Sequence, residues 1–401
     1  MNFENIKKFV YENMIIIILV ILYCFSYYLK NKKTSETMIN VGNSNGFWSR
    51  NQCNYYMNDT LKNVLNENTI QENATKWDLY MPCDYDNINR EINKMPNKKN
   101  GKYFIINNAD NMIAKEQLWN YVSQHHGIEK ARTMMPMTYV LYDEVSMMNF
   151  YKNYSKNKIY IMKKNIQRQE GLKITNNLQD IKNGLHEGYV LVQDLLQNPY
   201  IIDTRKTNMR FYVLVMCQKS DVSVYVYNDG FMYYTKAPFV KGTTDMEHNI
   251  TTGYIDRSVY AKNPLTHGDL RKYLDSHRNL NKIEQNMRNQ GLTISKLYFD
   301  RIYHLLREVF LSYVGNICGG TKLNENLTFQ LFGIDIAVDD TLNPTIMEIN
   351  KGPDMGAKDK RDYQVKYNVL QDMMKLVKVI TPTKTNGFIK LFKYENNNVH
   401  Y

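Results

Sequence analysis

Two apolar stretches near the C-terminus each carry acidic side chains, and this pattern constrains the fold more than any other. The stretches are Phe329–Val338 and Thr345–Asn350. Both have the length and the alternation of β-strands, in which successive side chains point to opposite faces. Alternation puts the large apolar residues of the first strand on its core face and Asp335 on the other. In the second strand, Glu348 and Asn350 share a face.

The geometry of a hairpin would bring these acids together. If residues Asp339–Pro344 form the loop, Asp335 lies directly across from Glu348, while Met347 points into the core. Two adjacent carboxylates repel each other unless a cation lies between them. Oxygen ligands without Cys or His suit Mg²⁺, which also takes waters and nucleotide phosphates. We therefore predict a Mg²⁺ site that includes Asn350. The alternative, a solvated sheet face with ordinary acids, fits such apolar strands poorly.

A second polar cluster is basic. Lys206, Asn208 and Arg210 alternate onto one face of an expected strand, and two cations on one face can bind a triphosphate. Lys163 ends another strand, beside a polar loop that contains Gly171 and would suit a flap over phosphates. Each pattern also fits an ordinary structural alternative, a hydrated strand face in the first case and a β-turn in the second.

Other sequence features narrow the ligand. Lys and Arg number 51 against 40 Asp and Glu, a net charge of +11 that favours a polyanionic partner. That partner is a nucleotide, a nucleic acid, an anionic lipid or an acidic protein tail. An apolar strand ends at Gln193, and backbone groups just beyond such a strand can bind an adenine edge. The chain has no P-loop motif and no kinase HRD or DFG motif, which disfavours both of those classes.

The N-terminal region indicates a membrane anchor. Met14–Leu29 is uncharged over sixteen residues and has lysines on both sides. A cleaved signal peptide would need small residues after the apolar run, and a buried core helix would be amphipathic; the segment has neither property. Lysines are slightly more numerous after the segment, which favours a single-pass protein with a cytosolic C-terminal domain. The five cysteines are widely spaced without a CxxC pair, so we expect reduced thiols rather than a zinc site.

Periodicity divides the chain into segments that together predict an α+β fold. Helices are expected over residues 114–127, 297–313 and about 363–380. The expected segments are a tail (1–13), a transmembrane anchor (14–30), a stalk (31–75), an N-terminal α/β subdomain (76–157), a central subdomain (158–240), a C-terminal subdomain (241–381) and a loose tail (382–401).

Four ordered motifs resemble those of the tubulin-tyrosine-ligase-like family of ATP-grasp enzymes. They are Met135–Tyr142, Tyr160–Thr175, Val192–Met216 and Phe329–Lys351. The resemblance covers about residues 115–380 and implies an ATP-grasp-like fold with mixed and antiparallel sheets. It implies ATP and Mg²⁺ as cofactors and no nucleic acid. The family's chemistry has two steps: a substrate carboxylate is phosphorylated, and the amine of a free amino acid then displaces phosphate to form an amide bond.

The resemblance also implies roles for individual residues. The implied nucleotide-binding residues are Lys163, Gln193, Leu195, Leu196, Lys206, Asn208, Asp335, Glu348 and Asn350. The implied metal ligands among them are Asp335, Glu348 and Asn350. The implied catalytic residues are Lys206, on a phosphate, and Arg210, near the amino acid or the transferred phosphoryl group.

The chain departs from the family pattern at three positions near the expected amino-acid site. Asn208 stands where the family has aspartate, Tyr233 where it has arginine, and Thr252 where it has asparagine. The leading interpretation is an active ligase that modifies a protein with an acidic tail, such as tubulin. The second is a membrane-anchored pseudo-ligase that binds nucleotide or an acidic tail without catalysis. The third, an anchored nucleic-acid binder, rests on charge alone.

Overall fold

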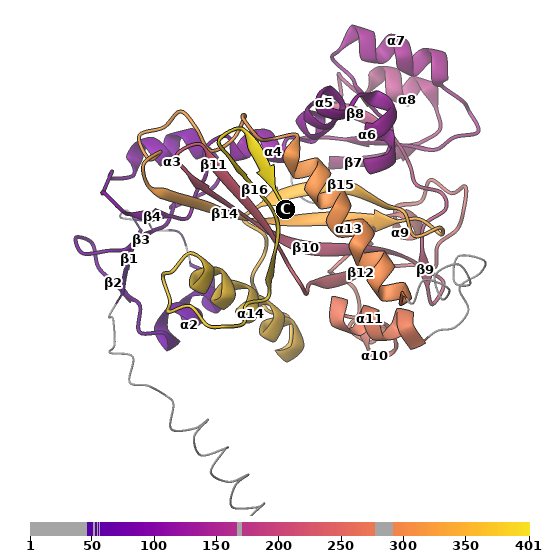
Figure 1. Cartoon of the computed structure of the whole chain (residues 1–401). Coiled ribbons are helices and arrows are strands. Elements are labelled where there is room, and N and C mark those ends of the chain that lie inside the picture. Colours follow the sequence, from indigo (N-terminus) through magenta and orange to yellow (C-terminus); the bar gives the residue numbers. More distant parts are fainter. Residues whose placement is uncertain (1–45, 51–52, 54, 56, 167–170, 277–291) are drawn as a thin grey trace, which may run out of the picture. The chain divides into compact units, whose positions relative to one another are not determined.

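The structure, a computed structural model, describes residues 46–50, 53, 55, 57–166, 171–276 and 292–401 (Figure 1). The folded unit runs from Gly46 to Tyr401. The predicted tail and the predicted anchor over 14–30 therefore lie outside the described residues. Within the described ranges, no helix is both long enough and apolar enough to cross a bilayer.

The long strand β10 (Arg205–Gln218) organises the larger of two sheets. It pairs antiparallel with β14 (Leu327–Val338) over most of its length. On its other side, its first part pairs with β12 (Phe231–Thr235) and its last part with β11 (Asp221–Tyr227). Strand β15 (Pro344–Lys351) pairs antiparallel with β14 and forms the predicted hairpin. Strands β14 and β15 match the expected runs Phe329–Val338 and Thr345–Asn350 closely.

Residues assigned to the stalk are folded from Gly46 onward. Helix α2 (Asp59–Glu67) begins at Asn58, whose side chain accepts hydrogen bonds from two backbone N–H groups, and it buries Val64 and Leu65. Four short strands run parallel to one another and extend the large sheet from β14: β1 (Phe47–Ser49), β2 (Gln71–Glu72), β3 (Leu79–Tyr80) and β4 (Lys102–Tyr103). Strands of two or three residues are too short to show period-two alternation. The prediction of a stalk therefore depended on the Asn-rich composition of the segment, and it was wrong.

The loose tail expected at the C-terminus is also folded. Strand β16 (Phe388–Glu395) pairs antiparallel with β11, and β17 (Asn398–His400) pairs with β16. Phe388, Leu391 and Phe392 are buried. These residues do not alternate, because the β11–β16 register shifts at Val224/Tyr225. The irregularity removed the period-two signal on which the prediction depended.

A smaller antiparallel sheet has its own core. Its strands, in spatial order, are β5 (Thr138–Val140), β8 (Leu191–Asp194), β6 (Tyr160–Lys163) and β7 (Leu172–Thr175). Phe150, on helix α7 (Glu144–Asn153), is fully buried and packs edge-on against Tyr139 and Tyr160. Mixed sheets with flanking helices confirm the α+β prediction.

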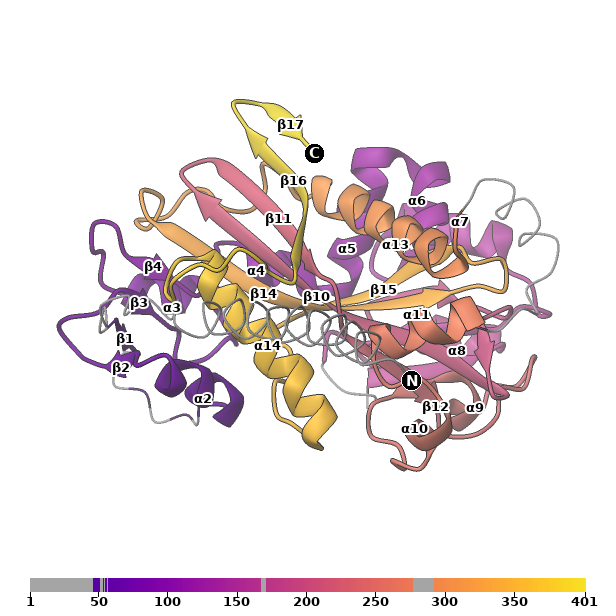
Figure 2. The same cartoon turned by 60° about the horizontal axis from the view of Figure 1, so that its bottom comes forward.

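Two long helices cover the large sheet, as Figures 1 and 2 show. Helix α13 (Ile294–Leu311) packs on it through one apolar side, with Phe310 against Phe332 at a ring-centroid distance of 6.3 Å. Helix α14 (Lys360–Leu376) packs against α2. The remaining elements are α3 (Ile88–Lys94), α4 (Ala109–Ile113), α5 (Lys115–His126), α6 (Ile128–Met134), α8 (Leu178–Asn183), β9 (Ile201–Ile202), α9 (Met246–Asn249), β13 (Thr251–Thr252), α10 (Val259–Lys262) and α11 (His267–Ser276).

Four cysteines form two disulfides, so the prediction of reduced thiols was wrong for these residues. Cys53 pairs with Cys83, 30 residues later, and Cys217 pairs with Cys318, 101 residues later. The second bond joins the end of β10 to the segment after α13. Both cysteine pairs were missed because the partners are far apart in the sequence and come together only in the folded protein.

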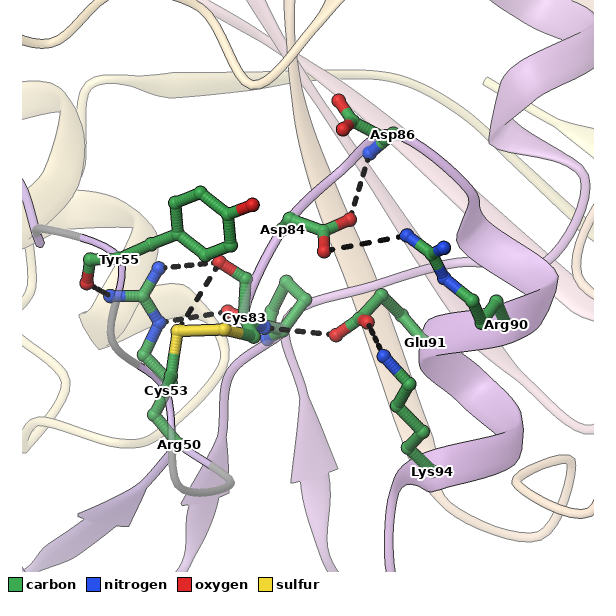
Figure 3. Close-up of a disulfide and its surroundings, with 10 residues drawn as sticks. Arg50, Cys53, Tyr55, Cys83, Asp84, Asp86, Arg90, Glu91 and Lys94 are labelled. Carbon is green, nitrogen blue, oxygen red and sulfur yellow. Dashed lines mark hydrogen bonds and ion pairs between the residues drawn. A yellow bond between two sulfur atoms is a disulfide. The ribbon is translucent and has the colours of Figure 1, made fainter.

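The first disulfide lies in a hydrogen-bonded cluster (Figure 3). The Arg50 guanidinium donates through Nε to the Pro82 carbonyl at 3.0 Å and through Nη2 to the Cys83 carbonyl at 2.7 Å. The Cys83 N–H donates to Glu91 at 3.0 Å. The segment that follows Gly46 is therefore fastened to the folded unit by covalent and polar contacts together.

Candidate active site

A pocket of about 1090 Å³ lies among the strands of both sheets. That volume is slightly above the usual range for ligand sites and leaves room for a nucleotide beside a second substrate. Its basic lining residues are Lys115, Lys163, Lys206, Arg210, Lys236, Arg257, Lys351, Lys358 and Lys366, and its acidic ones are Asp335, Glu348, Asp354 and Asp362. This excess of cations favours an anionic ligand.

The carboxylates pair as the alternation predicted, with one exception. Asp335 lies opposite Glu348, and Gly333 lies opposite Asn350. The register then shifts, so that Ile336 pairs with Ile346 and Met347 is the extra residue of a bulge. Met347 consequently lines the pocket together with Glu348, and the prediction that it points into the core was wrong.

Each carboxylate has a cationic partner within the protein. The Arg210 guanidinium binds Asp335 through two hydrogen bonds, Nε to Oδ1 at 2.6 Å and Nη2 to Oδ2 at 3.0 Å. The two residues are opposite each other in the β10–β14 ladder. Lys115 Nζ lies 3.2 Å from Glu348 Oε1. Burial raises the pKa of Asp335, and the adjacent Arg210 opposes that rise.

These residues fit a Mg²⁺–nucleotide complex chemically. Asp335, Glu348 and Asn350 present oxygen atoms to one pocket, and hard divalent cations prefer such donors. In the described ranges, no group of three or more His, Cys, Asp or Glu could hold a metal ion. A cation at this hairpin would therefore need the Asn350 amide and oxygen atoms from a ligand. An added Cβ at Gly333 would lie 2.9 Å from the Pro353 Cβ and 3.2 Å from the Arg210 side chain, so glycine leaves room for both.

Two buried lysines face the same pocket. Lys163 ends β6, and its Nζ donates to the Met347 carbonyl at 3.4 Å. Burial lowers its pKa to about 8 despite the nearby Glu348. Lys206 is 3% exposed, and burial, followed by repulsion from Lys163, lowers its pKa to about 8 as well. An anionic ligand would raise both pKa values again, since an opposite charge favours the ammonium form.

The lowered pKa of Lys206 predicts a pH dependence of anion binding. Below pH 8 the ammonium is charged and attracts phosphate; above pH 8 it loses its proton, so nucleotide affinity should fall. One deprotonated lysine should cost up to about tenfold in affinity per pH unit. Titration calorimetry of ADP between pH 7 and 9.5 measures this slope. The variant Lys206→Met should bind weakly with a shallower slope, and an identical slope would contradict the assignment.

The structure does not bring every predicted residue into the pocket. Leu195 lines it, whereas Gln193 and Leu196 do not. The Gln193 amide donates to the Thr138 hydroxyl at 2.7 Å, across the β5–β8 ladder. An adenine role for these three residues stays a prediction. Part of the expected flap after Lys163, residues 167–170, lies outside the described residues.

Sequence reasoning missed Lys115. It begins helix α5, lines the pocket and contacts Glu348, while its Nζ also donates to the Ile166 carbonyl at 3.1 Å. Its backbone N–H donates to the Asn165 side chain. A cation in the first turn of a helix is electrostatically unfavourable, because the N-terminal end of the dipole is positive. A lysine at the start of an expected helix is therefore unusual, and this feature of the sequence could have indicated a functional role for Lys115.

Strands from two sheets surround one cation-rich pocket, with carboxylates on a hairpin opposite buried lysines, as the resemblance to ATP-grasp proteins implies. Comparison with known families agrees with this class. Residues 94–387 match the model of the tubulin-tyrosine ligase family, and the chain belongs to that family.

Several curated proteins are similar to this chain. A probable beta-tubulin polyglutamylase of Tetrahymena thermophila is 27% identical over 57% of this chain and 20% of its own length. Tubulin polyglutamylase TTLL7 of Xenopus tropicalis is 24% identical over 64% of this chain and 29% of its own. Tubulin polyglutamylase TTLL6 of Mus musculus is 23% identical over 87% and 41%. The chain thus spans between a fifth and two fifths of these relatives.

Proposed function

We propose that this chain is an ATP-dependent ligase that joins a free amino acid to a carboxylate of a protein through an amide bond. The observation that carries the proposal is the pairing of Asp335 with Glu348 beside Asn350, facing the same pocket as buried Lys163 and Lys206. The cationic lining and the net charge of +11 favour an acidic acceptor. The names of the relatives make a tubulin tail the first acceptor to test.

The side chains that line the pocket would have different roles in such a reaction. Asp335, Glu348 and Asn350 would hold Mg²⁺ together with ATP, and the γ-phosphoryl group of ATP would activate the acceptor carboxylate, leaving ADP. Lys163 and Lys206 neutralise phosphate oxygens from one side of the pocket. Arg210, held by Asp335, presents its remaining N–H groups beside the reacting carboxylate.

The second step forms the amide bond. The unprotonated amine nitrogen attacks the activated acyl carbon, a C–N bond forms, the C–O bond to phosphate breaks, and the departing phosphate takes up the proton that the amine gives up. Groups fixed on strands favour this step, because they align the amine with the acyl carbon without reorganisation. We also propose that Met14–Leu29 anchors the chain to a membrane, because the segment is uncharged between flanking lysines.

A direct assay tests the ligase and its alternative, a pseudo-ligase motivated by Asn208, Tyr233 and Thr252. The protein is incubated with Mg²⁺–ATP, a panel of labelled amino acids and a tubulin-tail peptide or cell lysate. Mass spectrometry then identifies the labelled product. We expect ADP release that depends on both substrates, with one amide-linked amino acid in the product. Nucleotide binding without substrate-dependent ADP release would instead support the pseudo-ligase.

A further inference from the structure

The folded unit begins at Gly46, and the surface around this residue belongs to one end of the large sheet. Strands β4, β3, β1 and β2 follow β14 in that order at this end (Figures 1 and 2). The Phe47 N–H donates to the Asp78 carboxylate at 3.2 Å, and Trp48 pairs with Leu79 on β3. The first residues of the folded unit are therefore fixed beside β3.

Five lysines lie on this end of the sheet, and we call them the N-terminal basic surface: Lys76, Lys98, Lys99, Lys102 and Lys378. The turn that leads into β4 supplies Lys98, Lys99 and Lys102. The Lys98 ammonium donates to the Trp77 carbonyl, next to Lys76, and lies 4.8 Å from the centroid of the Trp77 ring. Lys102 Nζ donates to the Lys378 carbonyl at 2.7 Å, so the end of α14 joins the same surface.

These lysines are accessible and lack acidic partners. Four of the five are exposed, and Lys102 is half-buried. The nearby lysines Lys94 and Lys375 form ion pairs with acids on their own helices, whereas none of the five forms an ion pair with a described acid. Their charge is therefore available to a partner outside the chain.

The charges on this surface also influence one another. Burial lowers the pKa of Lys102, the nearby Asp78 opposes that shift, and the nearby Lys378 adds to it. The Lys102 and Lys378 ammonium groups are thus close enough to repel each other. An anion between them would relieve the repulsion, because an opposite charge favours the ammonium form.

The position of this surface along the chain indicates which anion it meets. Gly46 follows Leu29, the last residue of the apolar segment proposed as the anchor, by 17 residues. Even fully extended, that many residues span at most about 60 Å. A tether of this length keeps Gly46 within reach of the bilayer, so electrostatic attraction can decide which face of the folded unit turns toward it.

We propose that the N-terminal basic surface binds the anionic phospholipid headgroups of the membrane in which Met14–Leu29 is anchored. This inference rests on the anchor proposed above and not on the ligase reaction. Headgroup phosphates accept hydrogen bonds from ammonium groups, and clusters of about four to eight basic residues beside an anchor bind anionic lipid. None of the five lysines lines the pocket, so membrane binding and ligation use different side chains.

Lysine labelling of the full chain in lipid nanodiscs tests the proposal. The discs contain phosphatidylcholine alone or with phosphatidylserine, and mass spectrometry measures the rate at which an acetylating reagent modifies each lysine. We expect Lys98, Lys99 and Lys378 to react about threefold or more slowly in the anionic discs, and high salt to remove the difference. Lys152, exposed on α7, should react equally in both. Equal rates at the three lysines in both discs would overturn the proposal.

Charge reversal tests whether these particular lysines carry the binding. The triple variant Lys98→Glu/Lys99→Glu/Lys378→Glu should leave Lys76 equally reactive in both kinds of disc. The matched variant reverses three exposed lysines near the smaller sheet, Lys152→Glu/Lys156→Glu/Lys182→Glu, and should keep the wild-type protection of Lys76. All six side chains are exposed, so both variants should unfold at the wild-type temperature. Equal loss of protection in both variants would show attraction by net charge alone and overturn the surface.

Two further outcomes separate this surface from the anchor and from nucleic acid. If the full chain is not retained in neutral discs, the anchor fails, and flotation with phosphatidylserine vesicles decides the surface. Binding about a hundredfold stronger for the wild type than for the Lys98/Lys99/Lys378 variant would support it, and equal binding would overturn it. Protection of the same lysines by a single-stranded oligonucleotide, without protection by phosphatidylserine, would assign the surface to nucleic acid and overturn the proposal.

Discussion

Replacing Asp335 or Glu348 is expected to reduce amino-acid ligation by about 10³-fold or more, because each change removes a carboxylate from the only hairpin in the described pocket that presents two. Asp335→Ala should also lower thermal stability, since it leaves the Arg210 guanidinium without its two hydrogen bonds in a buried site. Glu348→Gln keeps the size of the side chain and should lose activity while it unfolds near the wild-type temperature.

The measurement combines incorporation of the labelled amino acid with calorimetric titration of ADP in the presence and absence of Mg²⁺. Glu325→Gln is the matched control, because Glu325 is 80% exposed and its ion pair with Lys219 is long, at 3.9 Å. We expect this control to behave like the wild type. Activity within tenfold of wild type in both Asp335→Ala and Glu348→Gln would rule out the metal assignment.

Breaking the disulfide between Cys217 and Cys318 is expected to produce the largest loss of stability. The bond closes a loop of 101 residues, and the chain-entropy relation gives about 4.7 kcal/mol for a loop of that size. The double variant Cys217→Ala/Cys318→Ala should therefore unfold at a clearly lower temperature and denaturant concentration. Both side chains are buried, so alanine is used to avoid leaving an unsatisfied hydroxyl.

The other disulfide provides an internal comparison. Cys53 and Cys83 close a loop of 30 residues, for which the same relation gives about 3.6 kcal/mol, so its removal should cost about 1 kcal/mol less. Denaturant unfolding with and without a reducing agent measures both effects. Equal midpoints for the oxidised and reduced wild-type protein would show that the bonds do not stabilise the folded unit.

Local periodicity was enough to predict the core strands and the carboxylate hairpin. Asp335 and Glu348 lie on apolar strands joined by a short loop, so alternation predicted that they face each other, and the structure pairs them across a bulge at Met347. Lys206 and Arg210 were placed on one face for the same reason. Each of these features depends on residues that are close in sequence, where a period of two is easily recognised.

The features that the sequence did not reveal depend on distant contacts or broken periods. Lys115 reaches Glu348 across more than 200 positions of the chain. The disulfide partners Cys217 and Cys318 meet only after β10 and the segment after α13 are packed. Met347 faces the pocket because the register shifts next to Asp335. Pattern analysis with a fixed period cannot anticipate a bulge or a pairing that the tertiary fold creates.

The pairing of β10 has a consequence for how this protein can change during evolution. One strand carries Lys206, Asn208 and Arg210 on its pocket face and is hydrogen-bonded to β14 on one side and to β11 and β12 on the other. Inserting or deleting a single residue just before Arg210 would turn every following side chain to the opposite face, so that the Arg210 guanidinium would enter the core. This strand can therefore vary by substitution but not in length.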